Sequence, residues 1–219
     1  FLADNISPTV DAIFAAPAQM HWVSLLLSVF LHSFQIYCDF SGYSDIAIGS
    51  ARILGFHIPE NFNRPFLSLT MTEMWRRWHI SFSSWVRDYV YFPLGGSRTS
   101  PPRAYFNLFM TMFVSGIWHG PTMNFVLWGV MHAVWLVLEK LLFSVDRIKK
   151  AYDSIPSILK IAYTFTAFSL ALFFFRARML PGFSSEMEVG FFMLKRAFTL
   201  VPGELVLPPA GVAVGILIL

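Results

Sequence analysis

The sequence contains several long runs of apolar residues, each bounded by short polar segments. A helix needs about 20 apolar residues to cross the hydrocarbon core of a bilayer, which is about 30 Å thick. The apolar runs therefore predict membrane spans at residues 20–38, 103–118, 122–143, 155–175 and 206–219. The second run is short, about 22 Å at about 1.5 Å per residue. We expect its C-terminal end to stop inside the membrane depth.

The two ends of the chain read as cut. Phe1 is not a start methionine, and the last apolar run stops part-way through the length of a span. We therefore expect the natural chain to continue in both directions.

The composition also favours a membrane and excludes some other classes. Apolar residues make up 56% of the 219 residues and charged residues 13%, whereas soluble domains average about 45–50% and about 25%. The net charge of +3 is small and spread out, so it fits the flanks of spans and predicts no nucleic-acid partner. The single cysteine, Cys38, excludes an internal disulfide and a multi-thiolate metal site. We predict an all-α polytopic membrane protein.

The segment at residues 70–91 has a different pattern. Thr70 and Glu73 have the spacing of a capping box, which predicts the start of a helix. Apolar residues then recur every three or four positions in one stripe, made of Met71, Met74, Trp75, Trp78, Phe82, Trp85, Val86 and Tyr89. The remaining surface carries several charges, so this amphipathic helix lies at the interface or lines a wet cavity. Residues 186–200 predict a second, shorter amphipathic helix.

His119 lies in the sharpest candidate site, the sequence Gly-Ile-Trp-His-Gly-Pro at residues 116–121. Gly120 and Pro121 break the helix and leave backbone carbonyls that only protein or water can satisfy at that depth. An ionisable residue within the membrane is a functional candidate, and histidine transfers protons near neutral pH. The alternative is that His119 only holds the turn through a hydrogen bond to one of those carbonyls.

The other histidines carry weaker signals. His79 lies at the border of the apolar stripe, where it is either a functional group or an amphipathic boundary residue. His21, His32 and His132 lie within predicted spans, where such groups more often hydrogen-bond a neighbouring helix. The sequence has no His-x-x-x-His pair and no Glu-x-x-His partner, so we predict no metal site.

Two polar segments are open to two interpretations. A polar cluster follows the first span, made of Asp39, Ser41, Tyr43, Ser44 and Asp45. It predicts either a substrate or gating loop or, slightly favoured, a helix break around Gly42 with Asx-turn and N-cap bonds. A second polar loop precedes the amphipathic helix, with Asn61, Asn63, Arg64 and Pro65. A membrane-surface loop of this kind usually contacts lipid headgroups.

Taken together, these motifs resemble those of the membrane-bound O-acyltransferase family, most closely its alginate O-acetyltransferase branch. The resembling segments are Tyr-Cys-Asp-Phe-Ser-Gly-Tyr-Ser-Asp at 37–45, Asn-Phe-Asn-Arg-Pro-Phe at 61–66, Trp-Arg-Arg-Trp-His-Ile-Ser at 75–81, the stretch 88–96, and Gly-Ile-Trp-His-Gly at 116–120. The likeness weakens after about residue 180. The family's membrane domain is longer, so the chain corresponds to its C-terminal half.

The resemblance implies a fold and a set of site residues. The fold is a funnel of tilted transmembrane helices with short helices inside the bilayer or at its surface. The family's essential histidine matches His119, and its second polar catalytic position matches His79. Candidates for binding the substrate or the donor are Arg76, Arg77, Trp78, Arg87, Asp39, Asn63 and Trp118. The arginines suit a phosphate-bearing donor, either acyl-coenzyme A or a carrier-bound thioester, with no bound cofactor.

The resemblance also implies a function and partners. We expect a multi-pass protein of the bacterial inner membrane that moves acetyl groups from a cytoplasmic thioester toward hydroxyls of an exported, alginate-like polysaccharide. An extracytoplasmic acetyltransferase partner and the lipid bilayer complete the expected surroundings. One alternative is transfer of D-alanyl or other acyl groups to cell-wall polymers. Another is a transporter without covalent chemistry, because broken helices and charges at membrane depth are also typical of permeases.

Overall fold

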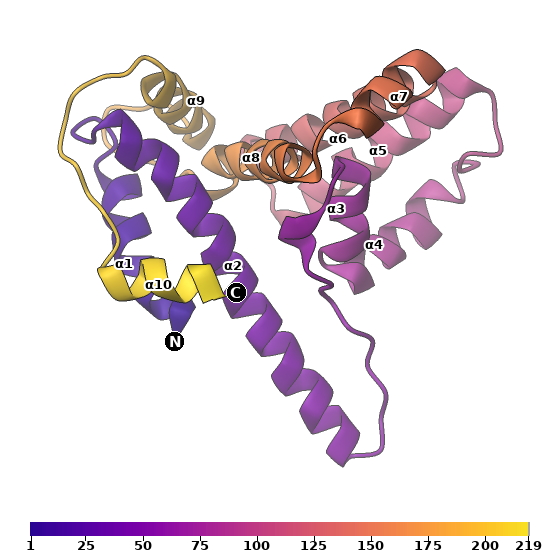
Figure 1. Ribbon diagram of the computed structural model, residues 1–219, viewed down its shortest axis with the longest axis horizontal. Coiled ribbons are helices and arrows are strands. Elements are labelled where there is room, and N and C mark those ends of the chain that lie inside the picture. The colour runs from indigo at the N-terminus through magenta and orange to yellow at the C-terminus, as the bar shows by residue number, and fades with distance from the viewer. Residues whose placement is uncertain (219) are drawn as a thin grey trace. The chain divides into compact units, whose positions relative to one another are not determined.

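The computed structural model describes residues 1–218 and is built almost entirely of helices (Figure 1). The chain forms two units: Phe1–Gly49 joins the segment that starts at Ser169, and Ser50–Phe168 forms the second. Within the described residues there is no strand beyond one isolated bridge between Met20 and Glu204. The prediction of an all-α protein is therefore confirmed.

Three of the described helices are long and apolar enough to cross a membrane: α2 (Trp22–Ile53), α6 (Met123–Phe143) and α8 (Ser157–Arg176). They overlap the apolar runs predicted as spans at 20–38, 122–143 and 155–175. Helix α5 (Pro101–His119) covers the short run at 103–118 but is not among these three. Helix α10 (Ala210–Ile218) covers most of the last run, and residue 219 lies outside the described residues. The membrane crossing of each helix and the funnel stay predictions.

The first unit contains α1 (Leu2–Ala15), most of α2, the end of α8, α9 (Glu186–Phe198) and α10. Polar contacts join these helices. The Ser33 and Ser169 hydroxyls lie 2.8 Å apart between α2 and α8, and Arg176 donates to the Asp11 carboxylate of α1. Helix α9 covers the segment predicted as the shorter amphipathic helix at 186–200. None of these groups belongs to the predicted catalytic pair.

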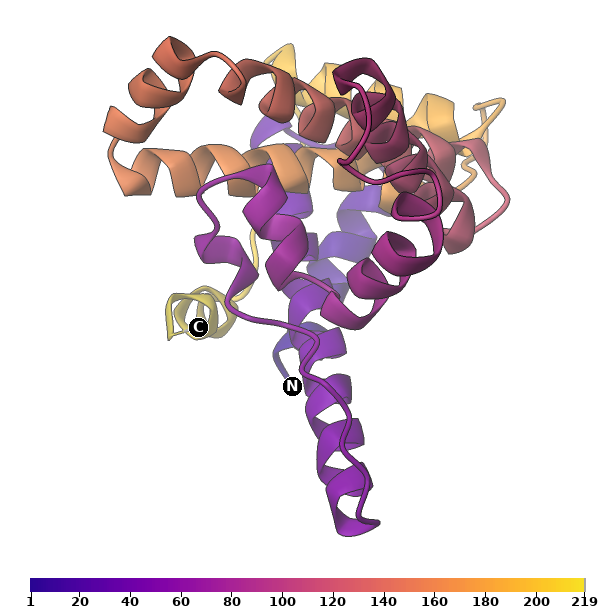
Figure 2. The ribbon, with the colours of Figure 1, turned by 90° about the vertical axis from the view of Figure 1, so that its right-hand side faces the viewer.

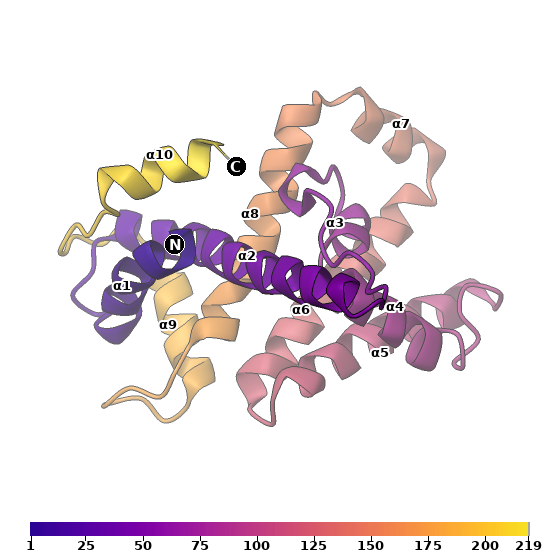
Figure 3. The same ribbon diagram turned by 90° about the horizontal axis from the view of Figure 1, so that it is seen from below.

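The second unit is built on α5 and α6, which lie side by side and are joined by a short turn (Figures 1 and 3). Two short helices, α3 (Met71–Arg77) and α4 (Ile80–Val86), pack against this pair. Helix α7 (Asp146–Ser154) links α6 to α8 (Figure 2). Its Tyr152 hydroxyl donates to the Leu69 carbonyl, just ahead of α3. All residues discussed below as a site lie in this unit, except Asp39.

The prediction of one continuous helix at 70–91 is wrong beyond its start. Thr70 does accept a hydrogen bond from the Glu73 amide, as the capping box predicted. The helix then stops at Trp78, restarts as α4, and continues as a π-helical segment, η2 (Arg87–Tyr91). At the end of the stripe, Trp85 is 46% exposed and Tyr89 69% exposed. The spacing of apolar residues within 70–91 does not predict the break. The break is caused by hydrogen bonds with the loop at residues 61–63, described below.

The favoured helix break around Gly42 is also wrong. Helix α2 runs without interruption from Trp22 to Ile53, and Asp39 and Ser41 lie within it. Polar residues and one glycine each destabilise a helix interior by only about 0.5–1 kcal/mol. The burial of apolar residues on the same helix, among them Leu25, Val29 and Ile48, outweighs that cost. The polar cluster is thus part of a long helix instead of a loop.

Candidate functional site

The junction between α3 and α4 presents His79 in an unusual backbone conformation. His79 has φ 45° and ψ 54°, in the left-handed region that few non-glycine residues adopt. Histidine is one of the residues found there more often than average. Because the chain turns at this single residue, the His79 side chain leaves the direction that a continuous helix would give it.

A polar loop holds this junction in place. The Asn63 amide donates to the Arg77 carbonyl at 3.0 Å, and the Ile80 amide donates to the Asn61 carbonyl at 2.9 Å. The side-chain oxygen of Asn61 also accepts from the Ser81 amide at 3.1 Å and from the Ser81 hydroxyl at 2.6 Å. Asn61 therefore caps the first turn of α4. From the sequence, the loop that carries Asn61 was expected only to contact lipid headgroups.

Helix α5 ends at His119, directly before Gly120 and Pro121, as the sequence predicted. Its last turns cross α6 at a pair of glycines. A Cβ atom at Gly116 would lie 2.5 Å from the Phe125 carbonyl oxygen and 3.1 Å from the Gly129 Cα. Such close backbone approach requires small residues on both helices. The crossing lies one turn before His119 and sets how the end of α5 faces α6.

The two histidines share two aromatic neighbours. The Phe82 ring centroid lies 5.0 Å from that of His79 and 6.0 Å from that of His119. The Trp118 ring lies 6.3 Å from His79 and 5.0 Å from His119. Phe82 and Trp118 are themselves only 4.4 Å apart. The structure thus brings together the two histidines that the sequence singled out, although they belong to different helices.

A second group of aromatic rings, made of Trp75, Trp128 and His132, lies next to His119. The Trp128 ring lies edge-on to His119 at 5.0 Å and to His132 at 4.8 Å. Trp75 of α3 contacts both Trp128 and His132, at 5.8 Å and 5.2 Å. His132 is fully buried, and both its ring nitrogens lack a hydrogen-bond partner among the described residues. His132 was expected to bond a neighbouring helix and instead lies in an aromatic enclosure.

The aromatic surroundings affect the charge of the histidines. Burial lowers the pKa of His79 from 6.5 to about 4 because an apolar environment disfavours the charged imidazolium. A positive charge on His79 would also act electrostatically on His119. His79 is therefore neutral at physiological pH, so it can accept a hydrogen bond or a proton.

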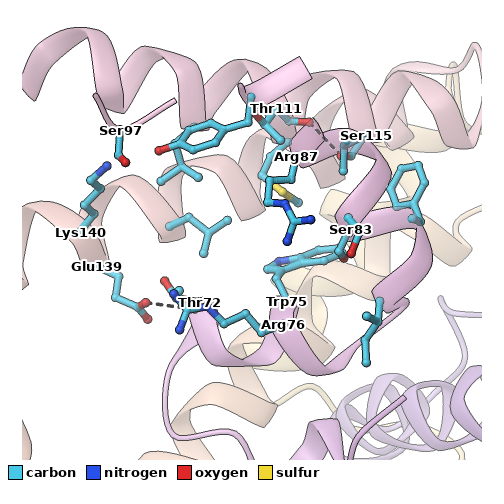
Figure 4. A pocket seen from close by; sticks show the side chains of 18 of the residues that line it. Thr72, Trp75, Arg76, Ser83, Arg87, Ser97, Thr111, Ser115, Glu139 and Lys140 are labelled. Atoms are coloured by element: carbon cyan, nitrogen blue, oxygen red, sulfur yellow. Dashed lines mark hydrogen bonds between the residues drawn. The ribbon is translucent and has the colours of Figure 1, made fainter. Parts of the chain in front are cut away.

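A cavity of about 650 Å³ opens between α3, α4, α5 and α6 (Figure 4). One part of its wall is apolar, with Leu108, Met112, Leu136 and Phe143 among the lining residues. Three cationic side chains also line it: Arg76, Arg87 and Lys140. Figure 4 shows the Arg87 guanidinium reaching in beside Trp75. The cavity combines an apolar wall with cations, which suits a ligand that has an apolar part and an anionic part.

The carboxylates of Glu139, which lines the cavity, and of Asp88, which is next to the lining residue Arg87, both have hydrogen-bond partners. Glu139 accepts hydrogen bonds from the Met71 and Thr72 amides at 2.7 and 3.0 Å, so its carboxylate fixes the first turn of α3. Asp88 pairs with Arg87 at 2.8 Å. The hydrogen bond with Arg87 lowers the pKa of Asp88 and raises that of Arg87, so both groups are charged at neutral pH. Among the described residues, Arg76 has no ion pair.

Several residues predicted to bind substrate or donor are not among the residues that line the cavity. Arg77 pairs with Glu73 at 2.5 Å, on the polar side of α3. Trp78 is buried and packs edge-on against Phe62 at 5.1 Å, in the core of the unit. The Asn63 backbone supports the junction, as described above. Asp39 is exposed on α2 in the other unit, so its relation to the histidines stays a prediction.

Three residues of this arrangement were not predicted from the sequence to belong to a site. Phe82 was assigned only to the apolar stripe, although its spacing of three from His79 would have put both on one helical face. Lys140 was assigned no role from the sequence, but it lines the cavity. Asn61 was read as part of a surface loop. No sequence signal links Lys140 to Arg76 or Arg87, because helix packing brings them together.

Comparison with known proteins identifies the family. The model of the membrane-bound O-acyltransferase family matches residues 1–176. The chain belongs to this family. The resemblance noted in the sequence is therefore confirmed. The family, together with the three long apolar helices, indicates a multi-pass membrane protein.

Curated relatives act on different acceptors. The probable alginate O-acetylase of Azotobacter vinelandii is 45% identical over 142 residues, covering 65% of this chain and 28% of that protein. The peptidoglycan O-acetyltransferase of Helicobacter pylori is 36% identical over 179 residues, covering 82% and 34%. The teichoic acid D-alanyltransferase of Bacillus subtilis is 36% identical over 155 residues, covering 64% and 38%. The chain thus spans 28–38% of the length of these relatives.

Proposed function

We propose that the protein carrying this chain is a membrane O-acetyltransferase. It moves acetyl groups from a cytoplasmic thioester donor toward hydroxyl groups of an exported polysaccharide. His79 and His119 both contact the rings of Phe82 and Trp118, beside a cavity that cationic side chains line. This observation carries the proposal. The family to which the chain belongs supports the reaction class.

His119 acts as the general base in this reaction. Its imidazole takes the proton of the acceptor hydroxyl as the hydroxyl oxygen attacks the thioester carbonyl carbon. The new carbon–oxygen bond forms, the carbon–sulfur bond breaks, and the departing thiolate receives the proton from the imidazolium. An alcohol and a thioester thus give an ester and a thiol, with no oxidant or reductant. General base catalysis of this kind contributes about 10²–10⁴-fold in rate.

His79 orients one of the two reactants. It is neutral at physiological pH because burial lowers its pKa to about 4, and a neutral imidazole can accept a hydrogen bond from the acceptor hydroxyl or the donor. A protonated His79 would disfavour the imidazolium that forms on His119 during transfer, since like charges repel. A neutral His79 therefore favours the uptake of the proton by His119.

The cavity binds the donor thioester. Arg76 and Arg87, with Lys140 added by the structure, provide cations for the phosphate groups of coenzyme A or of a carrier-bound phosphopantetheine. The apolar wall accommodates the pantetheine arm. Arg77 is left out of this role because it pairs with Glu73.

The polysaccharide that finally carries the acetyl group lies outside the cytoplasm, and the protein lies in the bacterial inner membrane. Two relatives are named for acetyl transfer to alginate and to peptidoglycan, both of them sugar polymers. An extracytoplasmic acetyltransferase partner receives the acetyl group and modifies the polymer. Transfer of D-alanyl groups is the second candidate, because a teichoic acid D-alanyltransferase is also a relative.

The test compares the acetyl content of the exported polymer in cells that produce the protein with or without His119→Ala. Membrane abundance is matched, and His57→Ala serves as control because His57 is an exposed histidine on a loop. We expect acetylation to be lost with His119→Ala alone, while polymer export continues. Unchanged acetylation would contradict the proposal. Loss of D-alanyl ester instead of acetyl ester would favour the second candidate, and loss of export itself would favour a transporter.

A further inference from the structure

Phe82 is the residue that belongs both to the cavity and to the histidine cluster. It lines the cavity together with Trp75 and Arg87, and its ring contacts His79 at 5.0 Å and His119 at 6.0 Å. Neither histidine is among the described residues that line the cavity. The phenyl ring of Phe82 is therefore a shared neighbour of the cavity and of the two imidazoles.

This part of the wall is held firmly. Phe82 is only 6% exposed, and the Trp118 ring packs on it at 4.4 Å. The first turn of its helix is fixed by the bonds from Ser81 to Asn61. A buried ring on a capped helix, packed against a second large ring, does not move aside without disturbing its neighbours.

We propose that Phe82 limits the length of the acyl group that can be transferred, and so selects acetyl over longer acyl chains. The inference rests on the proposed function. Reacting atoms must approach to about 3–3.5 Å for transfer, so the donor carbonyl has to come close to His119. The acyl chain beyond that carbonyl then lies against the Phe82 ring. A methyl group needs little room there, whereas each added methylene needs space that the ring occupies.

The size of the effect follows from known methylene selectivity. One extra methylene in a shaped apolar pocket changes the relative rate by about 10–200-fold. Removing the phenyl ring opens room for the additional methylenes of a propionyl or butyryl group. A larger ring at the same position has the opposite effect.

The test uses permeabilised cells that hold the complete protein with its membrane, partners and polymer. Isotopically labelled acetyl-, propionyl- and butyryl-coenzyme A are supplied together in equal amounts, and mass spectrometry gives the ratio of acyl groups on the polymer. We expect Phe82→Ala and Phe82→Leu to raise the butyryl-to-acetyl ratio at least about tenfold, and Phe82→Trp to lower the propionyl-to-acetyl ratio. Because each ratio is measured within one sample, differences in the amount of folded protein cancel.

The control is Phe143→Ala, which removes the same ring from a different part of the cavity wall. Phe143 lines the cavity but packs on Tyr152 at 4.8 Å, on the side of α7. The butyryl-to-acetyl ratio that Phe143→Ala gives should equal that of the unsubstituted protein. An unchanged ratio in the three Phe82 variants, or an equal rise in Phe143→Ala, would overturn the inference while leaving the proposed function intact. If the unsubstituted protein transfers none of the three acyl groups, the proposed function with coenzyme A as the donor fails, and the inference fails with it.

Discussion

Gly116 of α5 and Gly129 of α6 meet backbone to backbone. A Cβ atom at Gly129 would lie 2.6 Å from the Met112 carbonyl oxygen and 2.9 Å from the Gly116 Cα. Neither helix can move away freely, because the turn at Gly120 joins them a few residues later. This crossing is the reason that the His119 ring reaches Trp128 at 5.0 Å.

The first prediction concerns this crossing. Gly116→Ala and Gly129→Ala each force the helices apart, and overpacking of this kind destabilises by about 1–3 kcal/mol. We expect a lower midpoint of thermal unfolding in detergent and a loss of acyl transfer, since His119 shifts relative to Phe82. Gly49→Ala is the control, because a Cβ atom at that helical glycine meets nothing within 4 Å. Equal stability of all three variants would contradict the close crossing.

The second prediction concerns the backbone of His79. Its φ of 45° disfavours residues with a Cβ, but asparagine tolerates this region better than alanine does. We expect His79→Asn to unfold at a higher temperature than His79→Ala. Transfer activity should fall in both variants, because the imidazole is removed. If alanine is as stable as asparagine at this position, the left-handed conformation of the junction is not maintained in solution.

The third prediction concerns pH. Burial lowers the pKa of folded His79 to about 4, whereas its ordinary value of 6.5 applies to the unfolded chain. Between these values the unfolded chain binds a proton that the folded protein excludes, so stability falls as pH decreases from about 6.5 to about 4. The stability that is lost over this range is fully present above about pH 6.5. In unfolding measurements from pH 7 to pH 5, the unsubstituted protein should therefore lose more stability than His79→Asn. Parallel pH curves would argue against a buried, neutral His79.

The fourth prediction concerns the cations of the cavity. Arg76→Gln and Lys140→Met each remove one attractive charge, and a solvent-exposed charge contact contributes about 0.2–1 kcal/mol. We expect the KM for a coenzyme A thioester to rise by about two- to fivefold per substitution, with kcat nearly unchanged. The effect should shrink at high salt, since salt screens exposed charges. Arg98→Gln, an exposed arginine outside the cavity lining, is the control. A fall in kcat with no change in KM would assign these cations another role.

The sequence determined the elements whose causes are local. The apolar runs predicted α6, α8 and the first part of α2, because about 20 consecutive apolar residues have few stable solutions other than a long buried or membrane helix. The Thr70–Glu73 capping box and the Gly120-Pro121 break predicted where α3 begins and where α5 ends, since both signals act within a few residues. The motifs around His79 and His119 also predicted the family.

The tertiary structure decided what depends on contacts between distant segments. The predicted helix is divided at His79 by hydrogen bonds that Asn61 accepts and that the Asn63 amide donates. No periodicity within residues 70–91 contains that information. The packing of α4 against the end of α5 makes Phe82 a shared neighbour of both histidines. Helix crossing likewise brings Lys140 to the cavity that Arg76 and Arg87 line. Local signals define where helices begin and end, whereas the geometry of a site is set by which helix faces pack together.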